Sequence, residues 1–231
     1  DVLQHGLPTV DSDFTRKLFS HFTPEQVVGK AIKDKRGGND NIHSWEIGLK
    51  GDTTQEQSEF LNLLLLERRK RKWAAEVGID WMDGMPLTEQ QISTFYPRKN
   101  LKEFLDELVN MGYLTLENPR KKENNRRVPD ETKSKGYNIV SGKLSFEFTK
   151  ILDPAELAPT LVAMDVSHLG VIDNGGLRRL SIREGQRLCG FSEDYDLSFL
   201  KESEAFDLLG NTVCVPVIKA ISERLADMYV N

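Results

Sequence analysis

The stretch Gly176–Ser192, GLRRLSIREGQRLCGFS, constrains local folding more than any other part of the chain. Ser181 and Glu184 have the spacing of a capping box, in which the serine caps the third amide of a helix and the glutamate reaches back to the serine amide. Gly190 suits the left-handed conformation that ends many helices. The sequence therefore predicts a short helix here, preceded by a basic loop of two arginines at 178–179.

A second informative stretch, Ala205–Ile221, reads AFDLLGNTVCVPVIKAI. Its Gly-Asn-Thr segment should break the chain. A helix should then begin close to Pro216, because proline is tolerated in a first helical turn. Apolar residues recur every fourth position after this point, which predicts one buried face on the helix. The residues of this face are Val213, Val217, Ile221 and Leu225.

Together the two stretches resemble the last two conserved motifs of the DNA (cytosine-5) methyltransferases, which read approximately RxLTxRExxRLxGFPxxY and GNxVxxPVxxxI. The motifs stand in the family's order and at a similar separation. Residues 158–161, APTL, resemble the Thr-Leu element that closes the target recognition region in that family. Ser192 departs from the pattern, since proline is usual at this position.

The resemblance implies a cofactor and a partner. The cofactor is S-adenosylmethionine, bound mainly by an N-terminal catalytic half, with Asn211 and Thr212 offering polar groups at its edge. The partner is double-stranded DNA, whose phosphate Thr160 would contact, while variable residues between about 43 and 159 would read base edges. The resemblance also implies that the arginine-rich motif supports the recognition domain. Within that motif we predict three further DNA-binding residues, which are Arg178, Arg179 and Arg183.

The chemistry of that family needs groups that this sequence does not contain. A cysteine thiolate adds to carbon 6 of a flipped cytosine, a glutamate interacts with ring nitrogen 3, and the cofactor donates the methyl group. The family carries the cysteine in a Pro-Cys dipeptide and the glutamate in a Glu-Asn-Val tripeptide, and neither occurs in this sequence. The glycine-rich cofactor loop FxGxG is absent as well. We therefore expect no catalytic residue and no metal site in this chain, and no activity from it alone. Cys189 and Cys214 are interpreted as structural residues of the motif helices.

Composition limits where DNA could bind. The chain has 231 residues, a net charge of −5 and a pI of about 5.5, so any DNA-binding charge must be local. The mean hydropathy is −0.45 and no membrane span or secretory signal is evident, which predicts no membrane partner. Two cysteines do not make a disulfide framework. The expected location is the cytoplasm.

The N-terminal half contains several helix signals. Thr23, Pro24 and Gln26 should begin a helix that holds Val27, Val28 and Ile32. Residues 35–41 have the composition of a loop. Gln57–Val77 should form one long helix ending at Gly78, with Phe60, Leu61, Leu64 and Leu65 on one face. It would carry the basic run Arg68–Lys72, which is either a solvated helix end or a phosphate contact.

The next segment predicts helices followed by a hairpin. Thr88–Ser93 and a helix capped by Asn100 precede a stop at Gly112, and the second helix has an amphipathic face of Leu101, Phe104, Leu105 and Leu108. Strands are expected at Tyr113–Glu117, Tyr137–Val140 and Leu144–Phe148. The intervening segment Asn118–Lys135 is a basic loop in which Arg126 and Arg127 would bind DNA. The pattern resembles a winged helix.

These observations predict an α+β chain, with a winged-helix-like target recognition module followed by a segment that packs on a missing α/β methyltransferase domain. The expected divisions are 1–43 as a connection from the catalytic domain, 44–163 as target recognition, and 164–231 as the returning motifs; residues 194–207 should be an acidic surface loop. The favoured function is the target-recognition and C-terminal portion of a bacterial restriction-modification DNA (cytosine-5) methyltransferase. It would be a piece of a longer chain or one subunit of a split enzyme. The alternative is a non-enzymatic winged-helix DNA-binding or regulatory protein.

Overall fold

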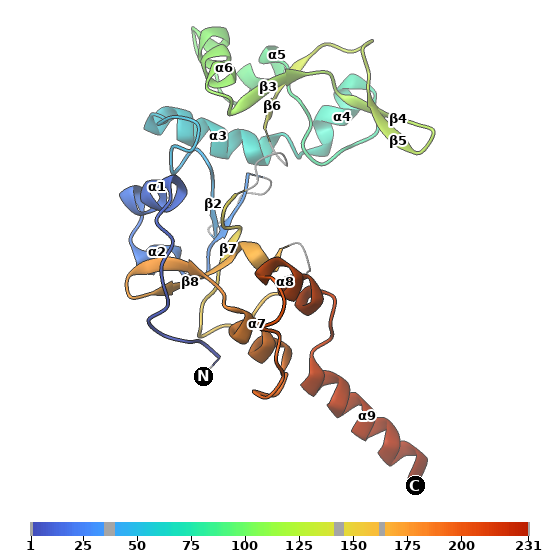
Figure 1. Cartoon of the computed structure of the whole chain (residues 1–231). Coiled ribbons are helices and arrows are strands. Elements are labelled where there is room, and N and C mark those ends of the chain that lie inside the picture. The colour runs from blue at the N-terminus through green and yellow to red at the C-terminus, as the bar shows by residue number, and fades with distance from the viewer. Residues whose placement is uncertain (1, 35–39, 141–145, 162–164, 231) are drawn as a thin grey trace. The chain divides into compact units, whose positions relative to one another are not determined.

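The computed structural model describes residues 2–34, 40–140, 146–161 and 165–230. The chain divides into two compact units (Figure 1). One joins Asp1–Ala31 to Phe146–Asn231 and is called the split unit; the other, Ile32–Ser145, is called the inserted unit. The division differs from the boundaries expected after residues 43 and 163. The expected N-terminal connection and the expected returning motifs both contribute to the split unit, because the strands at Ala31–Ile32 and Leu169–Asp173 each pair with the strand at Lys150–Ile151.

A small mixed sheet lies at the centre of the split unit. β8 (Leu169–Asp173) is parallel to β7 (Lys150–Ile151) and antiparallel to β9 (Gly176–Arg179). β1 (Ala31–Ile32) pairs antiparallel with β7. The β8–β9 turn has an Asn-Gly pair at 174–175 with positive φ at both residues, as a two-residue hairpin turn requires.

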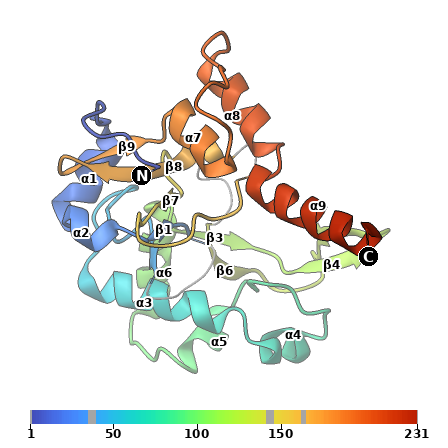
Figure 2. The ribbon, with the colours of Figure 1, turned by 90° about the horizontal axis from the view of Figure 1, so that it is seen from below.

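Helices α7 and α8 cover this sheet and lie side by side in both views (Figures 1 and 2). Together with β8 they bury a compact apolar cluster that includes Val171, Leu180, Cys189, Phe206 and Leu209. The helices of the split unit are α1 (Asp13–His21), α2 (Pro24–Val27), α7 (Ile182–Cys189), α8 (Glu202–Gly210), α9 (Val215–Val230) and the short 3-10 turn η1 (Val166–His168). The predicted helix between Ser181 and Gly190 is confirmed, with both capping-box bonds and a left-handed stop.

Two predictions for the split unit are wrong. The helix that begins at Pro24 ends at Val27, because Gly29 takes a φ of +76° and the chain turns into β1, where Ile32 lies. The segment 194–207 is not all loop, since α8 begins at Glu202 and buries Ala205, Phe206 and Leu209.

The apolar face predicted on the last helix is between 49% and 57% exposed at Val213, Val217, Ile221 and Leu225. Its burial against a missing domain therefore stays a prediction.

One stretch meets a length and hydropathy test for a membrane span, contrary to the expectation from the sequence. It is Glu202–Tyr229, 28 residues with a hydropathy of 1.3 over its best window, 17% of which is buried. The stretch is not one uninterrupted helix. α8 ends at Gly210 and α9 begins at Val215, with a turn between them. Length and composition alone therefore give weak support for a span.

The inserted unit contains helices α3 (Gln55–Glu67), α4 (Arg71–Val77), α5 (Glu89–Ser93) and α6 (Leu101–Asn110), and strands β2 (Asn41–Ile42), β3 (Leu114–Glu117), β4 (Arg120–Glu123), β5 (Arg126–Pro129) and β6 (Gly136–Ile139). β3 pairs antiparallel with β6 from Leu114–Ile139 to Glu117–Gly136. β4 and β5 form a separate antiparallel ribbon between them. The ribbon is inserted into the β3–β6 hairpin.

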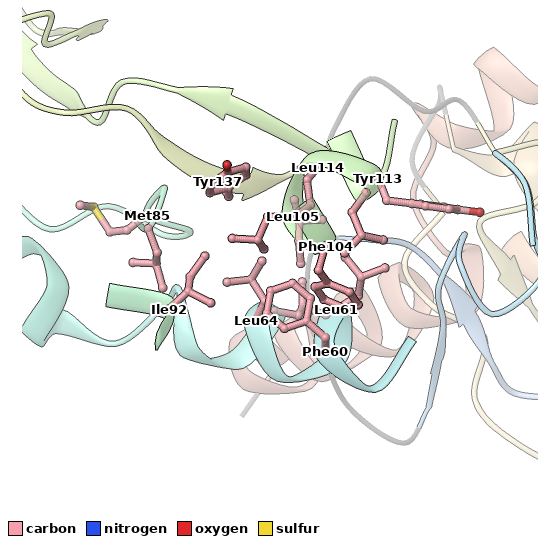
Figure 3. Packing of buried hydrophobic residues seen from close by; sticks show 14 of the residues in the cluster. Phe60, Leu61, Leu64, Met85, Ile92, Phe104, Leu105, Tyr113, Leu114 and Tyr137 are labelled. Atoms are coloured by element: carbon pink, nitrogen blue, oxygen red, sulfur yellow. The ribbon is translucent and has the colours of Figure 1, made fainter. Parts of the chain in front are cut away.

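The core of the inserted unit forms where α3 and α6 pack below the hairpin. Phe60, Leu61 and Leu64 of α3 point toward Phe104 and Leu105 of α6 (Figure 3). Phe60 and Phe104 meet edge to face, with ring centroids 5.2 Å apart. The predicted amphipathic faces of both helices are therefore confirmed as core.

The predicted long helix Gln57–Val77 is wrong, because it breaks after Glu67. Arg68 ends α3 with a buried side chain, and its Nη1 donates to Asn138 Oδ1 at 2.6 Å. Lys70 is extended, with φ −71° and ψ 132°, and α4 starts after it. Turning Arg68 inward to a long-range partner separates the basic run into two elements. Gly78 ends α4 in the left-handed conformation, as predicted.

The segment expected as a basic loop is mostly the β4–β5 ribbon. Asn124 and Asn125 form its turn, with φ of 47° and 60°, the left-handed pair that tightens a two-residue hairpin. The strand predicted at Tyr137–Val140 is present one residue earlier, as β6 at Gly136–Ile139. For the expected strand Leu144–Phe148, residues 144–145 lie outside the described residues, and residues 146–148 are not in a strand. The expected loop 35–41 also lies largely outside the description, and its last residue begins β2.

The helix ends predicted at Thr88, Asn100 and Gly112 are confirmed. Thr88 and Gln91 form the capping box of α5. Asn100 precedes α6 at the cap position, although its side chain makes no capping bond. Gly112 follows α6 with a φ of +84°. Short-range signals thus locate the helix ends correctly.

Replacing Leu105 or Leu108 with alanine should destabilise the inserted unit by about 2–5 kcal/mol, since each truncation leaves a cavity in a closed core. Both side chains are fully buried. Urea unfolding followed by circular dichroism measures the loss. Glu103→Ala on the exposed face of α6 is the control and should stay within about 0.5 kcal/mol of wild type. Equal behaviour of all three variants would mean that α6 is not part of the core.

Candidate functional site

A buried arginine organises the first motif. Arg178 lies on β9, is 2% exposed, and uses all five of its N–H donors. Nε donates to Asp173 at 2.9 Å, while Nη1 and Nη2 donate to the two carboxylate oxygens of Glu184 at 2.9 and 2.8 Å. The other two donors reach the carbonyl oxygens of Arg179 and Gln4. The bidentate geometry gives this pair both strength and orientation.

Glu184 completes the same network from α7. Its oxygens also accept from the amides of Gln4 at 2.7 Å and Ser181 at 2.8 Å, so the capping box of α7 and the N-terminal segment share one carboxylate. Burial raises the pKa of Glu184, but the hydrogen bonds from Arg178, Ser181 and Gln4 outweigh it and hold the pKa below its ordinary value. The pKa of Asp173 is likewise lowered, chiefly by its bond from Arg178.

The other motif arginines are also paired within the split unit. Arg179 bonds to the Ser167 carbonyl and lies 3.5 Å from Glu147. Arg183 donates to the Glu193 carbonyl at 2.6 Å, and Arg187 pairs with the Glu193 carboxylate at 2.7 Å. Arg178 and Arg179 are in a strand, so the expected basic loop is wrong. The DNA contacts implied for Arg178, Arg179 and Arg183 stay predictions, and for buried Arg178 they would require this network to open.

The second motif forms a turn between α8 and α9. The Asn211 Nδ2 donates to the Asp207 carbonyl at 2.9 Å, and the Thr212 amide donates to Leu209 at 3.3 Å. Pro216 packs directly on Gly190, where an added Cβ would lie 2.2 Å from the proline Cδ. The two motifs are therefore in contact at a point where only glycine fits.

A cavity of about 320 Å³ lies beside this contact, and two of the predicted site residues share it. Thr160 and Thr212 both line it, from segments far apart in the sequence. Its walls also include Leu161, Cys189, Leu209 and Cys214. The structure thus brings the Thr-Leu element and the second motif to one hollow. Asn211, on the exposed turn beside it, is not among its lining residues.

The two cysteines differ in environment. Cys189 is buried in α7, where burial raises the pKa of its thiol, and its Sγ lies 3.9 Å from the Leu209 carbonyl. These features agree with a structural role. Cys214 is exposed and precedes α9, so its predicted position inside a motif helix is wrong. Across the described parts of the chain, no group of three metal-ligating side chains occurs.

The predicted DNA-binding arginines of the inserted unit lie on the exposed strand β5. Arg127 Nη2 donates to the Trp81 carbonyl at 3.2 Å. Trp81 itself is 39% exposed in the loop after α4, with the Arg71 guanidinium 5.6 Å from its ring centroid. Trp81 was not predicted from the sequence as a functional residue. A tryptophan between Asp80 and Asp83 in a loop was the available signal.

The family comparison identifies the class of protein. The model for C-5 cytosine-specific DNA methylases matches residues 52–227. The chain belongs to this family. The resemblance inferred from the two motifs is thereby confirmed.

Individual relatives are more specific. The chain is 59% identical over 225 residues to the Type II methyltransferase M.NlaIV of Neisseria lactamica and 57% identical over 225 residues to M.NgoBV of Neisseria gonorrhoeae, in each case over 97% of this chain and 53% of the relative. It is 39% identical over 207 residues to M.BanI of Aneurinibacillus aneurinilyticus, over 90% of this chain and 43% of that protein. The chain thus spans about half the length of the curated relatives it matches. No solved structure matches it.

Arg178→Met should destabilise the chain by about 3–5 kcal/mol at pH 7, because it leaves two buried carboxylates without a counter-charge. Arg187→Met, on α7 of the same motif, is the matched control. The Arg187 side chain is 28% exposed and pairs with an exposed carboxylate, so its removal should cost less than about 1 kcal/mol. Urea unfolding of both variants measures the difference.

Lowering the pH should reduce the difference in free energy of unfolding between wild type and Arg178→Met. The lowered pKa values of Asp173 and Glu184 stabilise the folded state fully above their unfolded values of about 3.9 and 4.3, and this stabilisation is lost as pH falls through the folded values. In the variant the unpaired carboxylates should instead take up protons readily. A difference in free energy of unfolding that stays constant from pH 7 to pH 3 would contradict this assignment.

Proposed function

We propose that the chain is the target-recognition and C-terminal portion of a restriction-modification DNA (cytosine-5) methyltransferase that binds duplex DNA sequence-specifically. One observation carries the proposal. The Thr-Leu element and the Asn-Thr turn line or flank a single cavity, beside the contact between Gly190 and Pro216. The printed names of the relatives, which are Type II methyltransferases, support the same assignment. A non-enzymatic regulator is disfavoured, since it has no need of this arrangement.

The turn between α8 and α9 has polar groups suited to binding part of S-adenosylmethionine. The cofactor supplies the methyl group when bound. One of the two Nδ2 hydrogens of Asn211 is used internally, so its Oδ1 and the second Nδ2 hydrogen are the groups that it can offer. Thr212 adds a hydroxyl at the cavity wall. These two groups suit one edge of a cofactor and not a whole site. The rest of the site would belong to the N-terminal catalytic half.

The exposed face of α9 supports docking on that half. Val217, Ile218, Ile221 and Leu225 are each between 45% and 54% exposed, and a shallow apolar groove runs beside them from Pro216 to Leu225. An apolar helix face of this kind is unusual on a free surface. The α/β methyltransferase domain is the occupant that we propose, on the same chain or as a separate subunit. The proposed location is the cytoplasm.

The inserted unit supports a winged-helix interpretation. α5 and α6 precede the β3–β6 hairpin, and the β4–β5 ribbon takes the place of a wing. We propose that this unit is the target recognition module and contacts duplex DNA. The sequence of the DNA site depends on side chains in the groove.

The chain alone should transfer no methyl group to DNA, because it contains neither a Pro-Cys nucleophile nor a glycine-rich cofactor loop. Mixing it with the N-terminal half of the methyltransferase should restore sequence-specific transfer. In that mixture Asn211→Ala should raise the cofactor KM with little change in kcat, since it removes one binding group. Transfer of a labelled methyl group to duplex DNA is the assay.

Two variants of the same mixture act as controls. Cys189→Ser and Cys214→Ser should each keep the chemical step, because a buried thiol with a raised pKa is a poor nucleophile and an exposed thiol before α9 has no partner base within the described residues. Transfer by the chain alone that either substitution abolishes would disprove the proposal. It would reveal an active site within this chain.

A further inference from the structure

We propose that the DNA-facing surface of the inserted unit is centred on Trp81, with the β4–β5 ribbon and the turn between α3 and α4 as its two arms, and that α6 stays outside the groove. This proposal rests on the proposed function, since it concerns which surface of the target recognition module contacts DNA. It reverses the expectation for a winged helix, in which a helix enters the major groove.

Trp81 connects the two arms physically. Its indole Nε1 donates to the Arg69 carbonyl at 3.0 Å, which fixes the ring against the α3–α4 turn. The Arg71 guanidinium lies over the same ring. The Trp81 carbonyl accepts from Arg127 of the ribbon at 3.2 Å. Basic residues from two distant segments are therefore held around one half-exposed aromatic side chain.

The cations of the ribbon are free of carboxylate partners. Five of the residues of β4 and β5 are lysine or arginine and one is glutamate. Within the described chain, none of the five makes an ion pair; they are Arg120, Lys121, Lys122, Arg126 and Arg127. The arginines of the first motif, in contrast, are all paired with carboxylates. Unpaired, exposed cations are those that can exchange counterions for DNA phosphate.

The shape of the ribbon suits the same role. A two-stranded antiparallel ribbon fits the major groove of B-form DNA. The tight turn places two asparagines, Asn124 and Asn125, at its tip. Asparagine can bind the N6 and N7 edge of adenine with two hydrogen bonds. The ribbon therefore carries phosphate-binding charge along its length and a base-reading side chain at its end.

The exposed face of α6 has the opposite charge. Glu103 and Glu107 are exposed on it, and Lys102 is already paired with Asp106 at 2.5 Å. The hydrophobic face of the helix is closed in the core. A helix with a negative outer face would be repelled by phosphate on both sides of a groove.

A rigid base supports the Trp81 surface. The Met85 amide donates to the Arg68 carbonyl at 2.8 Å, and Arg69 pairs with Asp83 at 2.7 Å. Below them, Asn138 of β6 accepts from buried Arg68 and donates to the Gly84 carbonyl at 3.2 Å. The loop that carries Trp81 is thus tied to α3 and to the hairpin from which the ribbon extends.

The test is binding of the chain to a fluorescein-labelled duplex that carries the methylation site of the complete enzyme, measured by anisotropy over a range of salt concentrations. Arg126→Gln with Arg127→Gln should lower the slope of log affinity against log salt by up to about two, because each phosphate contact contributes about 0.9. Trp81→Ala should weaken binding by about 2- to 5-fold through loss of the Arg71 ring contact. Asn124→Asp with Asn125→Gly keeps the turn type and should reduce discrimination between specific and random duplexes.

Two controls separate this surface from alternatives. Arg16→Gln with Lys17→Gln removes two charges from α1 in the split unit and should leave the slope unchanged. Lys102→Ala with Asn110→Ala alters the outer face of α6 and should leave affinity unchanged. Circular dichroism confirms that each variant is folded, and the ribbon variant tests the proposal even where Trp81→Ala fails to fold.

The outcomes distinguish the two proposals. If the wild-type chain binds no duplex DNA, then the proposed function fails. If the wild-type chain binds DNA but the ribbon variant keeps the full salt slope, then the Trp81 surface is wrong while the function stands. Loss of binding in the α6 variant would overturn the inference, because it would place that helix in the groove.

Discussion

The split unit depends on the guanidinium of Arg178. A buried charge is costly unless its hydrogen bonds are complete, and here each of its N–H groups has an acceptor. The acceptors come from β8, from β9 itself, from α7 and from the N-terminal segment at Gln4. The β8–β9 hairpin, the helix of the first motif and residues at the far end of the chain are therefore fixed by one side chain. The arginines of the first motif therefore stabilise the fold, and this role does not depend on contact with DNA.

The inserted unit also contains a buried arginine, but with a different balance. Arg68 has a neutral amide of Asn138 as its close partner, and its Nε has no hydrogen bond in the described structure. Burial lowers its pKa to about 10, and the charges of Asp83 and Glu117 only partly oppose this effect. Its charged form is therefore less stabilised than that of Arg178. The loop that carries Trp81 contacts the Arg68 guanidinium at Gly84, so this loop is held by a weaker anchor than the motif helix.

Sequence reasoning succeeded where the cause of a structure lies within a few residues. The capping boxes at Ser181 and Thr88 and the left-handed glycine at 190 need only their own neighbours. It failed where the cause lies far along the chain. No residue close to Arg68 in the sequence indicates that its partner is Asn138, so the break in the helix could not be predicted. The high charge of residues 118–135 likewise predicted a loop where the β4–β5 ribbon is found. For the candidate site, the motifs located Thr160 and Thr212, but the burial of Arg178 and the position of Trp81 required the fold.

The contact between Gly190 and Pro216 limits how the length of the chain can vary. Both ends of the segment between them are fixed, one by the left-handed stop of α7 and the other by a proline ring with no room to retreat. Glu193 and Tyr195 accept hydrogen bonds from α7, so insertions or deletions are absorbed most readily in the exposed turn at residues 198–199, ahead of α8. Natural variation in length among relatives should therefore concentrate at that turn, while the helix junctions on either side keep constant length.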